Sequence, residues 1–139
     1  KPWLTQKWSR AIMDRYYGYD VSNAYLGDED QGQMSAWFLM SALGLFQTDG
    51  GCSVEPIYEL GSPLYKKVVV DLGQRFGRGD KLVIEAHHAS RLNMYIQSVK
   101  LNGKAWNDFK IPAHELLKGG HLELEMGPKP QPEFGLGNH

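Results

Sequence analysis

The sequence lacks the features that mark several large classes of protein. Cys52 is the only cysteine, so no disulfide can form within the chain. Fifteen Lys and Arg residues face sixteen Asp and Glu residues, which leaves a net charge of −1 and no basic excess for binding nucleic-acid phosphates. No apolar run approaches the roughly 20 residues that a membrane-spanning helix needs. We therefore expect neither a nucleic-acid partner nor a membrane span.

The sequence does contain enough apolar material for a folded core. Hydrophobic residues make up 42% of its 139 residues and aromatic residues 12%, and the length fits one domain or two small ones. Apolar residues recur at helical spacing in 3–17 and in 34–46, whereas the later chain changes to short strand-like runs. We expect an α+β protein with a helical part, 1–56, and a strand-rich part, 57–139.

The strand-rich part carries specific signals. Asn102-Gly103 predicts a tight hairpin, because both central residues of a type I′ turn need positive φ. The segment 121–126 alternates apolar and polar residues, as a half-buried strand does. In 94–101, strict alternation places Ile96 and Val99 on opposite faces. Other strands are expected at 66–72, 82–86 and 104–106, and one helical turn at 113–118.

The stretch 27–37 is the most informative part of the chain. Three acids in succession, Asp28, Glu29 and Asp30, precede an apolar helical pattern. Asp28 followed by Gln31 fits a capping box at the start of that helix, but a cap needs one acid and not three. Clustered carboxylates repel one another, so a protein that holds them together usually uses them. Taken alone, the residues favour capping and functional use about equally.

The order of residues in this stretch also resembles a known family. It reads Gly-Asp-Glu-Asp-Gln-Gly-Gln-Met-Ser-Ala-Trp and, with Ser-Ala-Leu-Gly at 41–44, resembles the signature of glycoside hydrolase family 92. Three later segments resemble further parts of that family in the same order: 58–65, which contains Gly-Ser-Pro, then 95–104 and 119–128. The likeness covers nearly the whole chain. Members of the family are calcium-dependent, inverting, exo-acting α-mannosidases.

The resemblance implies a fold and a place in a larger enzyme. Family members are several times longer, so we expect a C-terminal fragment: the last helices of an (α/α)6 barrel, followed by an antiparallel β-rich tail that forms a partial sandwich. The implied activity is hydrolysis of terminal α-mannosides, with α-1,2 linkages favoured. The family also implies calcium, with ligands mostly outside this chain, and a bacterial periplasmic or extracellular location. The expected partners are a mannose-containing glycan and the remainder of the parent chain.

Inverting hydrolysis of a glycoside needs a general acid and a general base, held roughly 6.5–9.5 Å apart to leave room for the attacking water. A helix N-terminus favours an ionised carboxylate, which suits the base. By resemblance the base is an aspartate of the motif, and Asp28 and Asp30 are the matching positions. We favour Asp30 slightly, since Asp28 is the better cap. Glu29 and Gln33 are expected to bind substrate. The family's acid, a glutamate, has no counterpart here, so the isolated chain should be inactive.

Other residues support weaker hypotheses. His87 and His88 are adjacent, and neighbours on a strand point to opposite faces, so the pair cannot chelate a metal from one side. The aromatic residues near the N-terminus fit core packing better than stacking on sugar rings. These residues are Trp3, Trp8, Tyr16, Tyr17, Tyr19 and Tyr25. A noncatalytic carbohydrate-binding or structural β-module, and a small binding protein unrelated to sugars, remain alternatives. The apolar helix at 34–46 predicts an exposed apolar patch where the parent chain, or a second copy, would pack.

Overall fold

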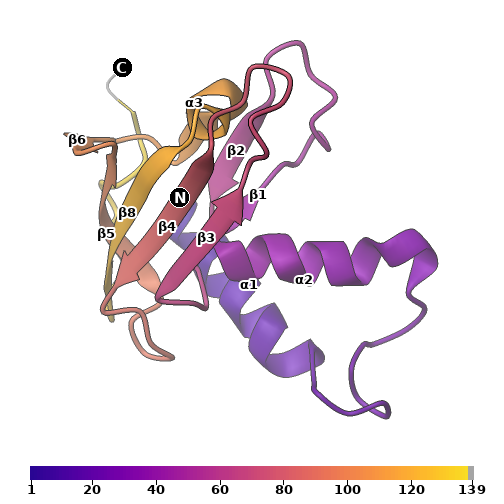
Figure 1. Ribbon diagram of the computed structural model, residues 1–139. Helices are drawn as coiled ribbons and strands as arrows, with labels where there is room; N and C mark the ends of the chain where they lie inside the picture. The colour runs from indigo at the N-terminus through magenta and orange to yellow at the C-terminus, as the bar shows by residue number, and fades with distance from the viewer. Residues whose placement is uncertain (138–139) are drawn as a thin grey trace.

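The structure is a computed structural model that describes residues 1–137. Two helices come first, and strands form most of the remaining chain (Figure 1). The helical elements are α1 (Pro2–Tyr16), the short 3-10 helix η1 (Asp30–Gly32), α2 (Gln33–Leu43) and α3 (Ala113–Leu117). The strands are β1 (Leu45–Phe46), β2 (Ile57–Leu60), β3 (Lys67–Asp71), β4 (Lys81–His87), β5 (Tyr95–Leu101), β6 (Lys104–Ala105), β7 (Lys110–Pro112) and β8 (Gly120–Gly127). The expected α+β class is confirmed. None of the helices in the described part is long and apolar enough to cross a membrane.

The strands form two sheets. The smaller has the order β1-β2-β7 and is antiparallel, and the larger has the order β3-β4-β8-β5-β6. The expected antiparallel tail needs one correction: β4 and β8 pair in parallel, whereas the other strand pairs are antiparallel. The chain leaves the β5–β6 hairpin, passes through β7 and α3, and returns between β4 and β5. A strand inserted in this way is antiparallel to β5 and parallel to β4.

The core lies where the inner faces of the strands meet α3. Alternate side chains of β8 point into this core as predicted, and Leu122 and Leu124 are almost fully buried. In β5 the predicted strict alternation was wrong: Ile96 and Val99 are both buried, because the register with β8 shifts at an irregularity between Ile96 and Ser98. Such a bulge moves later side chains to the other face. The Asn102-Gly103 turn is confirmed, with both residues at positive φ.

α1 packs through polar side chains. Its buried face includes Gln6, Arg10 and Met13, whereas Trp8 and Ile12 on the neighbouring row stay exposed. The Arg10 guanidinium donates hydrogen bonds to Ser62 Oγ and to the carbonyl oxygens of Pro63 and Ser90. Gln6 Oε1 accepts a 2.9 Å hydrogen bond from the backbone N–H of Ile96. The core packing expected for the aromatic row of this helix is therefore wrong for Trp8, because these polar contacts select the other face.

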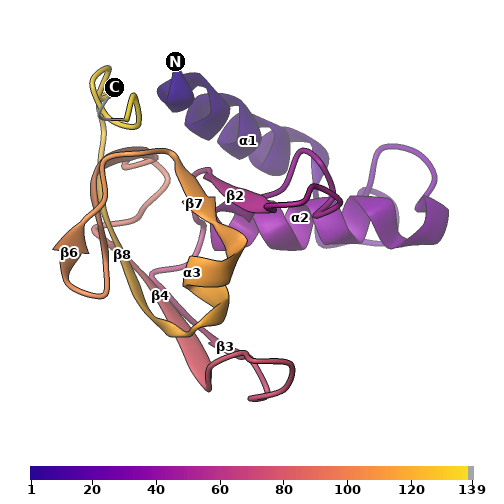
Figure 2. The same ribbon diagram turned by 90° about the horizontal axis from the view of Figure 1, so that it is seen from above.

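α2 is shorter than the predicted helix 34–46. Gly44 adopts a left-handed conformation (φ 79°), which ends the helix, and the next two residues form β1. Only Ser41 and Ala42 of α2 are buried, and Leu39 is 58% exposed. α1 and α2 lie side by side at one end of the strands (Figures 1 and 2).

The division at residue 56 into two domains stays a prediction. Hydrogen bonds between β1 and β2 cross that point. The last two residues of the proposed second part, 138–139, lie outside the described residues.

Candidate active site

The acidic stretch forms an exposed turn immediately before α2. Gly27 and Gly32 have positive φ values of 104° and 79°, and Gln31 between them is also left-handed at φ 55°. Such a conformation is uncommon for a residue other than glycine. A side chain added at either glycine would meet no atom of this chain within 4 Å. Both glycines therefore serve the backbone turn here, and the surface beside them is open.

Glu29 caps α2, which corrects the expected capping box of Asp28 and Gln31. Its Oε2 accepts a 3.0 Å hydrogen bond from the backbone N–H of Met34, and its Oε1 accepts one of 3.0 Å from that of Ser35. The left-handed turn folds the chain back, so that Glu29 reaches the free N–H groups of the first helical turn. Hydrogen bonding, chiefly from Ser35, lowers the pKa of Glu29 below its ordinary value.

Asp28 and Asp30, on either side of Glu29, are both exposed. Within the described part of the chain, the Glu29 side chain is the one acid of the three with hydrogen-bond partners. Gln33, the first residue of α2, is exposed as well. The structure therefore brings the four predicted site residues together on one short turn. It leaves two aspartates free and turns the glutamate inward.

An aromatic cluster lies behind this turn. The hydroxyl of Tyr25 is 2.7 Å from Ser35 Oγ, and the Tyr25 ring meets Tyr17 edge-on at 5.8 Å. Tyr17 in turn stacks on Trp37 and Phe38, with ring centroids 5.4 and 5.1 Å away. The end of α1, the loop 17–29 and α2 are thus held together by ring contacts. For Tyr17 the expected packing role is what the structure shows.

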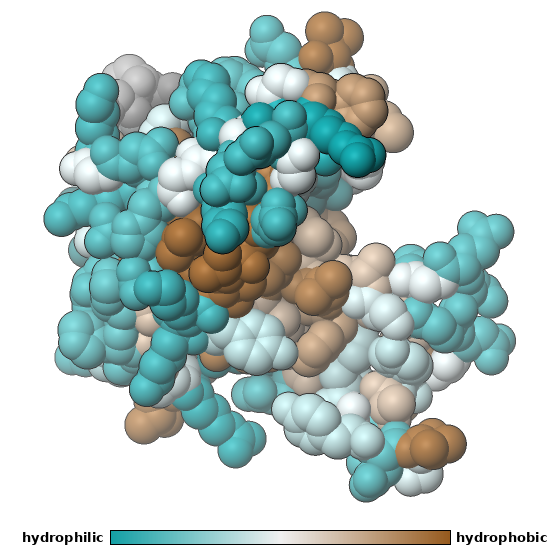
Figure 3. All heavy atoms as spheres, viewed as in Figure 1, coloured by the Kyte–Doolittle hydropathy of each residue, from teal (hydrophilic) through white to brown (hydrophobic). Residues whose placement is uncertain are grey.

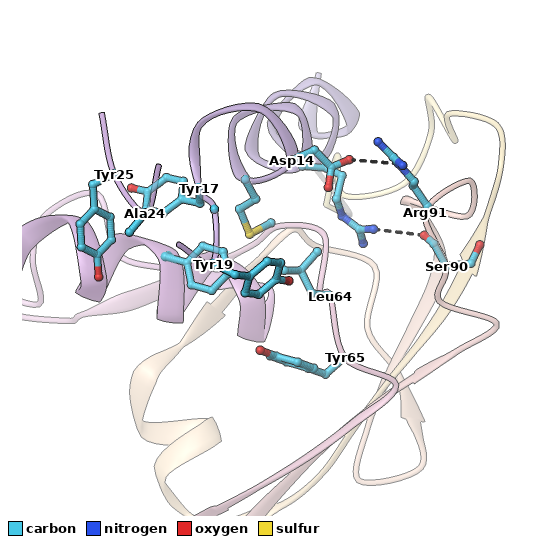
Figure 4. Close-up of a pocket in the computed structure, with 13 residues that line it drawn as sticks. Asp14, Tyr17, Tyr19, Ala24, Tyr25, Leu64, Tyr65, Ser90 and Arg91 are labelled. Atoms are coloured by element: carbon cyan, nitrogen blue, oxygen red, sulfur yellow. Dashed lines mark hydrogen bonds and ion pairs between the residues drawn. The ribbon is translucent and has the colours of Figure 1, made fainter. Parts of the chain in front are cut away.

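A pocket of about 630 Å³ opens on the other side of the cluster, between α1, α2 and the loops near residues 64 and 90. Tyr19 and Tyr65 flank it, and Asp14 pairs with Arg91 across from them at 3.8 Å (Figure 4). Tyr19 is fully exposed, so it does not pack in the core as expected. Tyr65 ends the segment 58–65 that carries part of the family resemblance, but neither Tyr65 nor Arg91 was predicted to belong to a site.

The described residues contain no group of three or more His, Cys, Asp or Glu side chains arranged to hold a metal. His87 and His88 pair instead with Glu123 and Glu125, at 3.5 and 2.6 Å. Calcium needs six to eight oxygen ligands, and the acidic turn offers Asp28 and Asp30 as unengaged carboxylates.

Comparison with known proteins identifies the class. The chain matches the model of the glycosyl hydrolase family 92 catalytic domain over residues 1–128. The match covers most of the chain, which therefore belongs to a family of glycoside hydrolases, family 92.

Relatives of known sequence or structure agree. The chain is 26% identical to a protein of Arthroderma benhamiae called an uncharacterized secreted glycosidase, covering 100% of this chain and 17% of that protein. A GH92 α-mannosidase from Bacteroides thetaiotaomicron superimposes with a TM-score of 0.84, at 29% identity, over 98% of this chain and 17% of its own. That enzyme has also been solved with mannoimidazole. A GH92 inverting mannosidase of the same bacterium gives a TM-score of 0.79 at 37% identity, over 96% and 18%. The chain therefore spans under a fifth of the length of these relatives.

Proposed function

We propose that this chain is the C-terminal part of an inverting, calcium-dependent α-mannosidase and supplies its general base. The observation that carries the proposal is the pair of free aspartates, Asp28 and Asp30, exposed on a turn at the start of α2. Mannosidases of the same family with similar structure support the substrate class. α-1,2-linked terminal mannosides of glycans are the proposed substrates.

The proposed chemistry uses one of the two aspartates. Its carboxylate removes a proton from a water molecule, which attacks the anomeric carbon from the face opposite the departing sugar. The base must be ionised near neutral pH, and the N-terminus of α2 favours the anion. Since Glu29 is the cap, the reason for preferring Asp30 over Asp28 no longer holds. We keep Asp30 and Asp28 as the two candidates, one as the base and the other orienting water or sugar, and Gln33 as a proposed sugar contact.

The rest of the machinery is assigned to the parent chain. It supplies the general acid that protonates the leaving oxygen, and most ligands of the calcium ion. The (α/α)6 barrel, of which α1 and α2 would be the last helices, also belongs to it. A periplasmic or extracellular location is supported by the name of one relative, a secreted glycosidase.

The surface of the two helices supports this assignment. A groove of about 260 Å³ between α1 and α2 is lined by Trp8, Ile12, Trp37 and Phe46, among others. Trp8 is 56% exposed and Ile12 37%. A separate group of apolar side chains lies in the middle of the face shown in Figure 3, where Figure 1 draws β3 and β4. We propose that the remainder of the parent chain covers the groove, and that the chain expressed alone self-associates through it.

The aromatic pocket favours a second candidate, a noncatalytic carbohydrate-binding module. Tyr19 and Tyr65 beside the Asp14–Arg91 pair offer the ring faces and polar groups that a sugar needs. Titration of the isolated chain with mannosides distinguishes the two. The catalytic proposal expects weak binding or none, whereas tight binding that Tyr65→Ala abolishes favours the module.

The decisive test is made in the full-length parent enzyme. Asp28→Asn and Asp30→Asn remove one charge each without changing volume, and we expect each to lower kcat for mannoside hydrolysis by at least about a hundredfold. Asp20→Asn, in the exposed loop after α1, is the matched control and should stay near the wild-type rate. Near-normal rates for both site variants would end the catalytic interpretation.

A further inference from the structure

We propose that Glu29 is a positioning residue: it anchors the acidic turn to α2 and thereby presents Asp28 and Asp30 to solvent, without touching substrate itself. This inference depends on the proposed function of the two aspartates. It also revises the expectation that Glu29 binds the sugar. The argument comes from the contacts of the three acids, which differ although the residues are adjacent.

Both oxygens of the Glu29 carboxylate are engaged. Oε2 accepts from the N–H groups of Met34 and Ser35, at 3.0 and 3.2 Å, and Oε1 accepts from Ser35 at 3.0 Å. These N–H groups belong to the first turn of α2, where helical partners are absent. To bind a sugar hydroxyl, the carboxylate would have to share or give up these bonds. Among the described residues, the side chains of Asp28 and Asp30 have no hydrogen bonds to give up.

The anchor continues into the aromatic cluster. The Ser35 hydroxyl is 2.7 Å from the hydroxyl of Tyr25, whose ring packs edge-on against Tyr17. Tyr17 has a raised pKa, first through burial and then through the charge of Glu29. Glu29 is therefore held between the helix and this cluster. The left-handed Gln31 beyond it costs backbone energy that such fixed contacts can offset.

The experiment compares Glu29→Ala and Glu29→Gln in the full-length parent, with Glu55→Ala in the exposed loop before β2 as control. We expect Glu29→Ala to lower kcat by at least about tenfold, with KM for an aryl α-mannoside within about threefold, as for loss of orientation. The amide oxygen of Glu29→Gln can still accept both N–H groups, so kcat should return to within about threefold of wild type.

Several results would overturn the inference. One is a raised KM with unchanged kcat in Glu29→Ala, which is typical of a lost substrate ligand. The others are wild-type kinetics in both variants, and a kcat that stays as low in Glu29→Gln as in Glu29→Ala. If Glu29→Ala does not fold, Glu29→Gln decides, since a kcat more than about threefold below that of the wild type refutes the anchoring role. Asp28→Asn and Asp30→Asn are measured alongside. If they remain active the proposed function itself fails, whereas their inactivity beside normal Glu29 variants rejects the positioning role alone.

Discussion

Replacing the buried Arg10 by Met tests how α1 is held to the strands. Arg10 is 3% exposed, and its guanidinium donates to Ser62 Oγ, the Pro63 carbonyl and the Ser90 carbonyl. Met preserves most of the side-chain volume and removes the charge and all three hydrogen bonds. The change therefore separates the polar contribution of Arg10 from its packing.

The magnitude follows from opposing terms. Hydrogen bonds to a charged group contribute about 1.5–3 kcal/mol each, and two of the three are buried. The loss of these hydrogen bonds is partly offset, because the folded state no longer bears the cost of removing the Arg10 cation from water. Arg10 Nε also has no partner in the described structure, so the network is not fully satisfied. We expect a net loss of about 2–4 kcal/mol in the free energy of unfolding.

The assay is thermal unfolding of the isolated chain followed by circular dichroism. For a protein of this size the loss corresponds to a fall in Tm of about 5–15 °C. Arg15→Met, on the exposed side of the same helix, is the matched control and should change stability by less than about 0.5 kcal/mol. Equal Tm values for the two variants would show that Arg10 does not anchor α1.

Two further predictions concern stability. Gly44→Ala should lower the free energy of unfolding by about 1–3 kcal/mol, because φ at Gly44 is 79° and the new Cβ would lie 2.9 Å from Pro63 Cδ. Gly50→Ala is the control, since φ there is 62° but the space around the new Cβ is open. Urea unfolding of both variants should show the larger loss at Gly44. Glu85→Gln should weaken the acid dependence of Tm. The hydrogen bond from His121, with Lys67 nearby, lowers the pKa of Glu85 from its ordinary value of 4.5. The ionised Glu85 therefore stabilises the fold fully above pH 4.5, and this stabilisation is lost as the pH falls through the lowered pKa of the folded state. Glu133→Gln is the control, and identical acid limbs for wild type and Glu85→Gln would refute the assignment.

The strand half was predictable wherever a local pattern sets the geometry. The Asn102-Gly103 turn and the alternation in β8 follow from φ preference and from the period of two. The irregularity after Ile96 and the parallel pairing of β4 with β8 depend on which strands become neighbours. That choice is made by contacts distant in sequence, which no local pattern contains.

The helical half shows a similar division. Spacing located α1 and α2 to within a few residues, but the face that α1 buries was not predictable. Hydrophobic periodicity predicts that Trp8 and Ile12 are buried, but both are exposed. Gln6 and Arg10 are buried in their place, and they form hydrogen bonds with partners more than 50 residues away. At the acidic turn the three acids were recognised together. Which of them caps α2 depends on the left-handed Gln31, and nothing in the composition reveals that conformation.

α2 connects the proposed catalytic turn to the strand tail. Its first turn is held by Glu29, and at its last turn the carbonyls of Ala42 and Gly44 accept hydrogen bonds from the N–H groups of Leu64 and Gly61, at 3.0 and 2.9 Å. Ser62 and Pro63, which lie between those two donors, accept hydrogen bonds from Arg10 of α1. Because one short helix links both ends, a shift in the strand tail would move the aspartates. The tail is thus connected through α2 to the turn that carries the two aspartates.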